Sequence, residues 1–395
     1  MDNTPDDPDD TDMSGTIQRR MQAVRDWIDA KIAAIVTWFR KLPDRIRDFL
    51  DRTPADAQAI LLLGVVSFAA AAYFFWRSPG QAATPLTLFA GATAVGWIRH
   101  RGRTAKALTM LASVVTVAIL LLIISFLVLH SRDAFEHMGT ELLWRLEPPF
   151  WEAPSPDGTY SLTPLMVGTA LTTVIATMIA APLGIAGAVF ISEMAPRRVR
   201  EVVKPGIELL AGIPSITYGF VGLTIVNQYF YTEFQTPTIA SYFAAGVMIG
   251  LMALPTVVSV AEDALASVPE SMKSGSLAMG STEWQTTKSV TIPAAFSGVS
   301  AAVLLGVGRA MGETMAATVM LSHTKGVPDP FFDVFSRYGE TLTTVIASEA
   351  PNAIGGMHES ALFAAGVVLF VSVMLLSITA QYVEWRMHRK LGGQS

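Results

Sequence analysis

The sequence predicts an all-α membrane protein that crosses the bilayer several times. Of its 395 residues, 51% are hydrophobic and only 15% are charged, whereas soluble domains carry about a quarter charged residues. Several apolar runs are long enough to cross roughly 30 Å of hydrocarbon as helices. Lysine and arginine are concentrated in alternate connections between these runs, as in multi-pass proteins with a fixed orientation.

The first 57 residues precede the predicted spans. Residues 1–13 are rich in Asp and Pro, and we expect them to be disordered. From Ile17 to Leu42, apolar residues recur every three or four positions, which predicts a helix with one apolar face. This helix either lies on the inner leaflet of the membrane or packs on protein, and the sequence favours neither interpretation.

Eight transmembrane helices are predicted. The first two form a hairpin within residues 58–104, and the other six lie within residues 105–390. Most of the 28 lysines and arginines fall on the side that carries both termini, so both termini are expected to be cytoplasmic. The predicted spans are 58–76, 82–98, 107–129, 163–191, 206–228, 239–260, 294–321 and 361–383.

The connection 261–293, between the sixth and seventh spans, predicts two short helices. Ser267 with Glu270 and Thr282 with Gln285 have the spacing of capping boxes. Gly280 is expected to end the first helix, and Pro293 to end the second before the next span.

This connection also carries apolar residues that would be exposed. Such a helix pair suits a groove on a soluble partner, whereas the alternative is an ordinary solvated connector. The residues assigned to docking are Leu277, Ala278, Met279, Gly280 and Trp284.

Arg309 and Glu313 interrupt the seventh span. A spacing of four residues predicts that they lie on one helix face. A charge at mid-membrane costs at least ~2.5–3.5 kcal/mol, so both side chains should face the protein interior or a water-filled path. Thr314 lies near the same face and would add a hydroxyl, whereas the Thr318 hydroxyl is expected to bond back to its own helix.

Three interpretations of this pair compete. In the favoured one, Arg309 offers its planar guanidinium to an oxyanion, and Glu313 orients the arginine. The pair is otherwise a structural bridge between helices or part of a proton relay. A second irregular place is the stretch Ala211–Ser215, where Gly212, Pro214 and Ser215 predict a break that either lines the pathway or is a simple kink.

The spacing in the 261–293 connection resembles a family signature. Gly280 is followed, after nine residues, by Val290, Thr291, Ile292 and Pro293, as in the MetI-like permeases of type I ATP-binding-cassette importers. The family's Glu-Ala-Ala triplet is replaced by Ser274, Gly275 and Ser276, and Glu262 or Glu270 would have to supply the missing acid. The stretches "ELLAGIPSITYGFVGL" and "GRAMGETMA" resemble phosphate-importer permeases, and "GETMA" favours the PstC type over PstA.

The resemblance covers residues 105–390 and implies a fold and a set of partners. It implies a MetI-like core of six helices, here preceded by the extra hairpin, in the inner membrane of a prokaryote. The implied partners are a PstA-like permease, two PstB-like ATPase subunits that bind ATP and Mg, an extracytoplasmic PstS-like binding protein, and inorganic phosphate. A PstA-type subunit or a permease for another oxyanion is the alternative.

Other function classes fit the sequence less well. No GxxxxGK[ST] loop is present, so the ATPase site is expected on a partner chain. Without cysteines or clustered histidines, no metal site or cofactor is expected, and nothing indicates nucleic-acid binding. An ion-driven secondary transporter would need inverted repeats and several buried carboxylates, and a membrane-embedded enzyme would need a nucleophile with its base.

Overall fold

The computed structural model describes residues 53–153 and 158–390, together with scattered residues between 22 and 51. The predicted acidic tail and most of the predicted amphipathic helix lie outside the described residues. The described part is built of helices and loops, and its one β-type contact is an isolated bridge between Trp151 and Tyr160. The chain divides into two compact units, residues 1–123 and 124–395, with the boundary inside helix α5.

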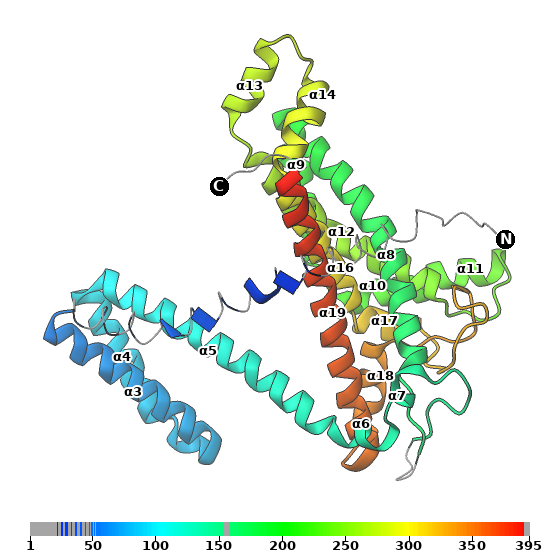
Figure 1. The fold of residues 1–395 in the computed structure, drawn as a ribbon, viewed down its shortest axis with the longest axis horizontal. Helices are drawn as coiled ribbons and strands as arrows, with labels where there is room; N and C mark the ends of the chain where they lie inside the picture. Colours follow the sequence, from blue (N-terminus) through cyan, green and yellow to red (C-terminus); the bar gives the residue numbers. More distant parts are fainter. Residues whose placement is uncertain are drawn as a thin grey trace, which may run out of the picture. The chain divides into compact units, whose positions relative to one another are not determined.

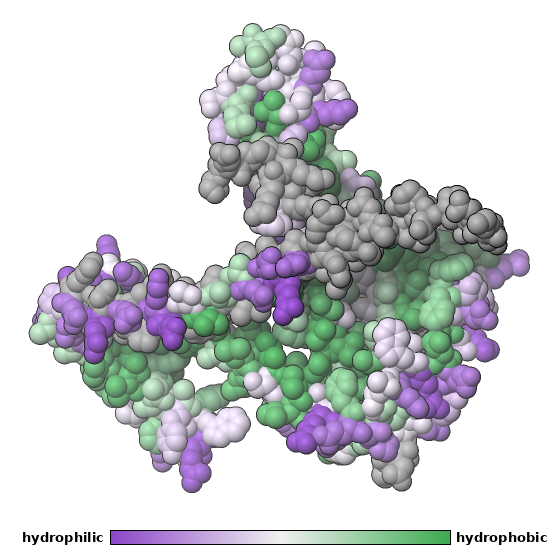
Figure 2. All heavy atoms as spheres, viewed as in Figure 1, coloured by the Kyte–Doolittle hydropathy of each residue, from purple (hydrophilic) through white to green (hydrophobic). Residues whose placement is uncertain are grey.

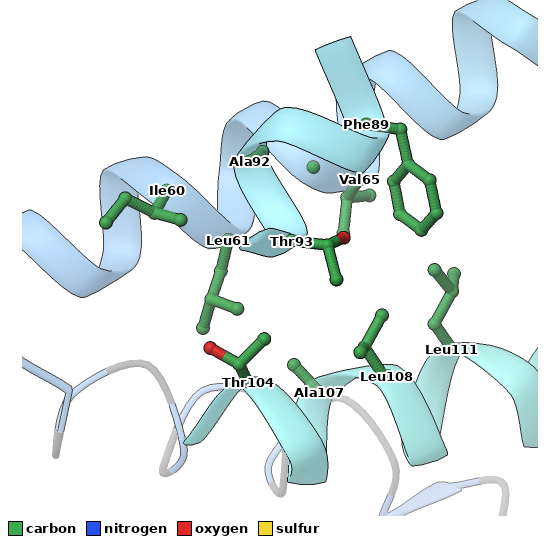
Figure 3. Close-up of a pocket in the computed structure, with 11 residues that line it drawn as sticks. Ile60, Leu61, Val65, Phe89, Ala92, Thr93, Thr104, Ala107, Leu108 and Leu111 are labelled. Carbon is green, nitrogen blue, oxygen red and sulfur yellow. The ribbon is translucent and has the colours of Figure 1, made fainter. Parts of the chain in front are cut away.

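The first unit contains the predicted hairpin. α3 (Ala55–Arg77) and α4 (Ala83–Arg99) pack against each other across a short turn, Pro79–Gln81, and α5 (Arg101–His130) follows (Figure 1). His100 lies 2.8 Å from Asp56 and joins the end of α4 to the start of α3. An apolar cavity of about 30 Å³ lies between the three helices. Figure 3 shows some of the side chains that line it, among them Leu61, Phe89 and Leu108.

The second unit contains all the predicted site residues. Its helices are α6 (Arg132–Met138), α7 (Glu141–Trp144), α8 (Thr163–Val189), α9 (Arg197–Ala211), α10 (Ser215–Val221), α11 (Gln228–Glu233), α12 (Tyr242–Ala266), α13 (Glu270–Ala278), α14 (Glu283–Thr286), α15 (Ile292–Ala294), α16 (Phe296–Met311), α17 (Met315–Met320), α18 (Leu342–Glu349) and α19 (Gly356–Lys390). Single π-helical turns occupy Phe190–Met194, Gly222–Asn227 and Thr287–Thr291, and a 3₁₀ turn occupies Ala350–Asn352.

Helices α8, α12 and α16 form the centre of this unit. Their backbones approach closely because small residues lie at the contacts: a Cβ atom on Gly250 of α12 would lie 2.9 Å from the carbonyl oxygen of Ala176 in α8. Gly306 of α16 likewise packs on Val257 of α12. Figure 2 shows apolar surface over the middle of the unit and hydrophilic residues at its ends, as expected for membrane helices.

Five described helices are long and apolar enough to cross a membrane, and the number rises to seven if two bent pairs each count as one span. The five are Ala55–Arg77, Arg101–Met138, Thr163–Met194, Tyr242–Ala266 and Gly356–Trp385. The bent pairs are Arg197–Ala211 with Ser215–Glu233, at 88°, and Glu283–Ala294 with Phe296–Met311, at 71°. The chain is therefore a multi-pass membrane protein.

Two predicted spans are not continuous helices. The segment 206–228 bends at Gly212–Pro214, because Pro214 cannot continue the hydrogen-bond ladder of α9. The segment 294–321 ends its main helix at Met311, and Gly312 to Thr314 separate it from the short α17. The interruption at Gly212–Pro214 was predicted, whereas the one after Met311 was not, so the prediction of 294–321 as one uninterrupted helix was wrong.

Candidate functional site

Arg309 lies in the last turn of α16 and is half-buried. Its Nη1 donates a 2.6 Å hydrogen bond to Oγ1 of Thr256 in α12. Among the described residues this is the one hydrogen bond of the guanidinium, and no carboxylate lies within ion-pair distance of it. The group therefore keeps several N–H donors with which it can bind an anion.

Glu313 does not lie above Arg309 on one helix face, so that geometric prediction was wrong. α16 ends at Met311, and Glu313 stands in the break that follows. Its Oε1 accepts a 2.9 Å hydrogen bond from the backbone N–H of Ala316, in the first turn of α17. Neither a direct orienting contact to Arg309 nor a structural bridge between the two side chains is present in this conformation.

The two threonines after Glu313 serve mainly local structure. Thr314 takes the N-cap position of α17, and its hydroxyl lies 3.3 Å from the Gly312 carbonyl. The Thr318 hydroxyl donates to the Thr314 carbonyl at 2.7 Å, which confirms the prediction of back-bonding.

The two breaks are brought together by the helices that follow them. α10 begins at Ser215, directly after Gly212 and Pro214, and packs against α17. The contact is close, because a Cβ atom on Gly219 would lie 2.9 Å from the Cα atom of Ala316. Two segments about a hundred residues apart in the chain thus form one region of interrupted helix.

The connection between α12 and α16 forms two short helices that project together at one end of the unit (Figure 1). Gly280 has φ +91° and ends α13, and Thr282 with Gln285 makes the predicted capping box of α14. The box predicted at Ser267 is absent, because its hydroxyl bonds back to the Ala264 carbonyl. Pro293 does not end the second helix, which continues through a π turn and α15 to Ala294.

The residues assigned to docking lie at the surface of this projection. Leu277, Ala278 and Gly280 are exposed, and the larger Met279 and Trp284 expose 84% and 57% of their surface. An exposed apolar set of this kind is typical of a protein contact.

The Ser274–Gly275–Ser276 triplet has a structural consequence. Ser276 is buried, and its Oγ accepts a 3.0 Å hydrogen bond from Thr286 of α14. The small polar residue therefore joins the two helices of the projection. Glu262, one candidate for the missing acid, is also buried and lies 2.5 Å from Nζ of Lys204 in α9.

A cluster of charged residues at the opposite end of the unit was missed by the sequence analysis. Lys325 Nζ lies 2.5 Å from Oε1 of Glu349 and 3.8 Å from Oε2 of Glu340. The fully buried Glu340 also lies 3.1 Å from Nδ1 of His323. These residues are widely spaced in the chain, so only the tertiary fold reveals the cluster.

Thr256 and Thr343 were also missed. Thr256 carried a weak signal, as a hydroxyl beside Pro255 in an otherwise apolar run. Thr343 donates to the Glu313 carbonyl at 2.8 Å, a contact across thirty residues that no local pattern indicates. Among the described residues, no group of three or more His, Asp or Glu could hold a metal ion.

Comparison with known proteins gives consistent matches over this unit. A family model described as "Binding-protein-dependent transport system inner membrane component" matches residues 180–389. The probable ABC transporter permease protein YqgH of Bacillus subtilis is 37% identical, over 72% of this chain and 91% of that protein. The phosphate transport system permease protein PstC of Mesorhizobium japonicum is 34% identical, over 57% of this chain and 73% of that protein. The PstC protein of Haemophilus influenzae is 30% identical, over 73% of this chain and 94% of that protein.

Proposed function

Because this chain belongs to the family of binding-protein-dependent transport system inner membrane components, we propose that it is the PstC-type permease subunit of an ATP-driven importer of inorganic phosphate. The similarity to PstC proteins over most of their length carries this proposal. The chain supplies a transmembrane pathway, and ATP hydrolysis takes place on partner subunits.

We assign the anion contact to Arg309. Its side chain is half-buried, and within the described part of the chain its guanidinium makes one hydrogen bond, to Thr256. A planar fork with spare donors matches the geometry of a phosphate oxyanion. Glu313 and Thr314 stand at the helix break beyond it, where the carboxylate limits the positive charge that would otherwise trap the anion.

The pathway also includes the break at Gly212, Pro214 and Ser215. Irregular backbone at membrane depth is tolerated where it lines a cavity or packs on protein. The packing of α10 on α17 supports this assignment, since it joins the break to the segment that carries Glu313.

Energy enters through the projecting helices α13 and α14. Leu277, Ala278, Met279, Gly280 and Trp284 form the surface that docks on an ATPase subunit, an exposed apolar set suited to a groove. Two PstB-like ATPases bind ATP and Mg, a PstA-like permease completes the pore, and a PstS-like protein delivers phosphate from outside. This chain itself binds no cofactor.

The proposed topology has eight crossings. The five long helices, the bent pair Arg197–Ala211 with Ser215–Glu233, the single helix α16 and the 17-residue α4 supply them. The excess of Lys and Arg on the side of α13 and α14 supports a topology in which that side and both termini are cytoplasmic and the protein lies in the inner membrane of a prokaryote. The charged cluster around Glu340 then faces outward.

The test is uptake of radiolabelled phosphate by proteoliposomes that hold the complete importer. Uptake should require ATP and the ATPase subunits. Arg309→Gln should reduce it at least tenfold, as removal of a charged contact worth about 1.4 kcal/mol or more predicts, with complex assembly intact. Arg132→Gln, an exposed arginine of α6, is the control. Uptake by this chain alone without ATP would contradict the proposal, and loss of assembly in Arg309→Gln would favour a structural role.

A further inference from the structure

α17 is a helix of six residues, and both of its ends are tied to the start of α18. At the first end, the Thr343 hydroxyl donates a 2.8 Å hydrogen bond to the carbonyl oxygen of Glu313. At the other end, Nε2 of His323 donates to the Thr318 carbonyl at 2.9 Å, while Nδ1 faces Oε1 of Glu340 at 3.1 Å. Glu340 and Thr343 are three residues apart, so one short stretch holds both ends.

The start of α18 is itself firmly anchored. Glu340 is fully buried, and the Tyr242 hydroxyl of α12 accepts from its N–H at 3.2 Å and lies 3.3 Å from its carbonyl oxygen. The N–H of Leu342 donates to the Thr169 hydroxyl of α8 at 3.0 Å. Buried backbone groups paired in this way fix the stretch to the central helices.

α17 cannot fix its own position. A helix of six residues is unstable alone, so its placement comes from tertiary contacts. α10 supports one side through Gly219, and the Asn227 side chain donates to the Met320 carbonyl at 3.0 Å. Among the described residues, the Thr343 bond is the one side-chain hydrogen bond to the backbone of Glu313.

We infer that Thr343, supported by the His323–Glu340 pair, positions Glu313 for anion transfer. The inference rests on the proposed function, in which Glu313 belongs to the pathway. Thr343 has no contact with the anion; it fixes the backbone from which the Glu313 carboxylate reaches the Ala316 N–H. When the bond is lost, the break between α16 and α17 gains freedom, and the carboxylate spends less time in place.

The test compares Thr343→Val with Thr343→Ser in the complete importer, reconstituted with its ATPase subunits and binding protein. Valine keeps the shape and removes the donor, whereas serine keeps the hydroxyl. Thr343→Val should lower the maximal phosphate uptake rate about three- to tenfold, because it removes the bond to Glu313 and also the 3.0 Å hydrogen bond between the Thr343 and Thr341 hydroxyls. The concentration of loaded binding protein at half-maximal rate and the rate of ATP hydrolysis should stay unchanged, so less phosphate moves per ATP. Thr343→Ser should restore the wild-type ratio.

His323→Ala is the second variant, because its side chain is one-third exposed and its loss is compatible with folding. It removes the tie at the other end of α17 and should also lower the phosphate moved per ATP. If Thr343→Val does not assemble, His323→Ala decides the question. If the assembled Thr343→Val importer moves as much phosphate per ATP as the wild type, the inference is overturned. The same result in His323→Ala overturns it if Thr343→Val does not assemble. Absence of phosphate uptake by the wild-type complex would instead overturn the proposed function.

Discussion

Nζ of Lys273 lies 2.8 Å from Oε1 of Glu193, and the two side chains expose only 15% and 9% of their surface. Lys273 belongs to α13, and Glu193 to the π turn that ends α8. The Ser192 hydroxyl donates to the same carboxylate oxygen at 2.8 Å. A largely buried ion pair therefore fastens the projecting helices to one of the three central helices.

Breaking this pair should detach α13 from α8. Lys273→Met leaves Glu193 buried without its partner, a change that costs about 3–5 kcal/mol in a fully buried pair and less here, where some exposure remains. We expect faster hydrogen exchange in residues 270–278 and more ATP hydrolysed per phosphate moved.

The matched control is Arg197→Gln, which breaks an exposed Arg197–Glu201 pair on α9 and should change neither quantity. Exchanging the charges, Lys273→Glu with Glu193→Lys, should recover part of the coupling. Unchanged exchange in Lys273→Met would show that the pair does not hold α13.

Replacing either of two glycines in the projecting helices by alanine should change stability, but in opposite directions. Gly280 has φ +91°, a conformation that strains other residues, so Gly280→Ala should destabilise the junction of α13 and α14 by roughly 1–2 kcal/mol. Gly275 lies inside α13 with open space around it, so Gly275→Ala should stabilise the helix by about 0.5–1 kcal/mol. Hydrogen exchange of α13 in the intact protein measures both, and equal effects would contradict the assigned roles.

Local signals in the sequence predicted local structure well. Gly280 and the Thr282–Gln285 box were identified correctly because a cap depends on residues within one turn. The break at Gly212–Pro214 was also predictable, because a glycine and a proline stand close together there. A single proline is a weaker signal, since Pro182, Pro205 and Pro255 lie inside continuous helices. The angle of 88° at the Gly212–Pro214 break could not be predicted, because the angle between α9 and α10 depends on the helices against which they pack.

The break at Gly312 could not be predicted from its neighbours. Gly306, Gly308 and Gly312 look alike in sequence, yet only Gly306 packs closely on another helix and only Gly312 stands where the helix ends. The Glu313 carbonyl, just beyond this end, is bonded by Thr343 from thirty residues away, a contact that no local pattern indicates. The prediction that Arg309 and Glu313 lie on one face of a continuous helix was therefore wrong. Both residues nevertheless lie at the place where the helix is interrupted.

Stability should depend on the protonation of His323. Its Nε2 and Nδ1 both face acceptors, the Thr318 carbonyl and the Glu340 carboxylate, so the doubly protonated ring satisfies both. The hydrogen bond to Glu340 raises the pKa of His323 above its usual value, against the opposing effects of burial and of Lys325. Lys325 also pairs with Glu349, which in turn lies 3.4 Å from Nε2 of His358, and the Tyr242 hydroxyl contacts the backbone of Glu340.

The raised pKa of His323 determines how the stability of the protein changes with pH. The stabilisation is fully present below the unfolded-state pKa of His323 and is lost as pH rises through the higher folded-state pKa. The melting temperature in detergent should therefore fall from neutral to mildly alkaline pH. His323→Gln should flatten that slope, whereas His137→Gln, an exposed histidine of α6, should leave it unchanged. If the melting temperature of His323→Gln falls with pH as steeply as that of the wild type, a group other than His323 is responsible for the pH dependence.

Deletion of residues 58–98 should leave phosphate transport intact. The segment contains nearly all of α3 and of α4, which pack chiefly on each other within the first unit. Two proposed crossings are removed together, so the second unit keeps its orientation in the membrane. Uptake by the reconstituted importer should stay within about twofold of wild type, a difference of roughly 0.4 kcal/mol.

Deleting α3 alone is the informative control, because it removes one crossing and should prevent correct insertion. Complete loss of uptake by the normally inserted 58–98 deletion would mean that the hairpin takes part in transport.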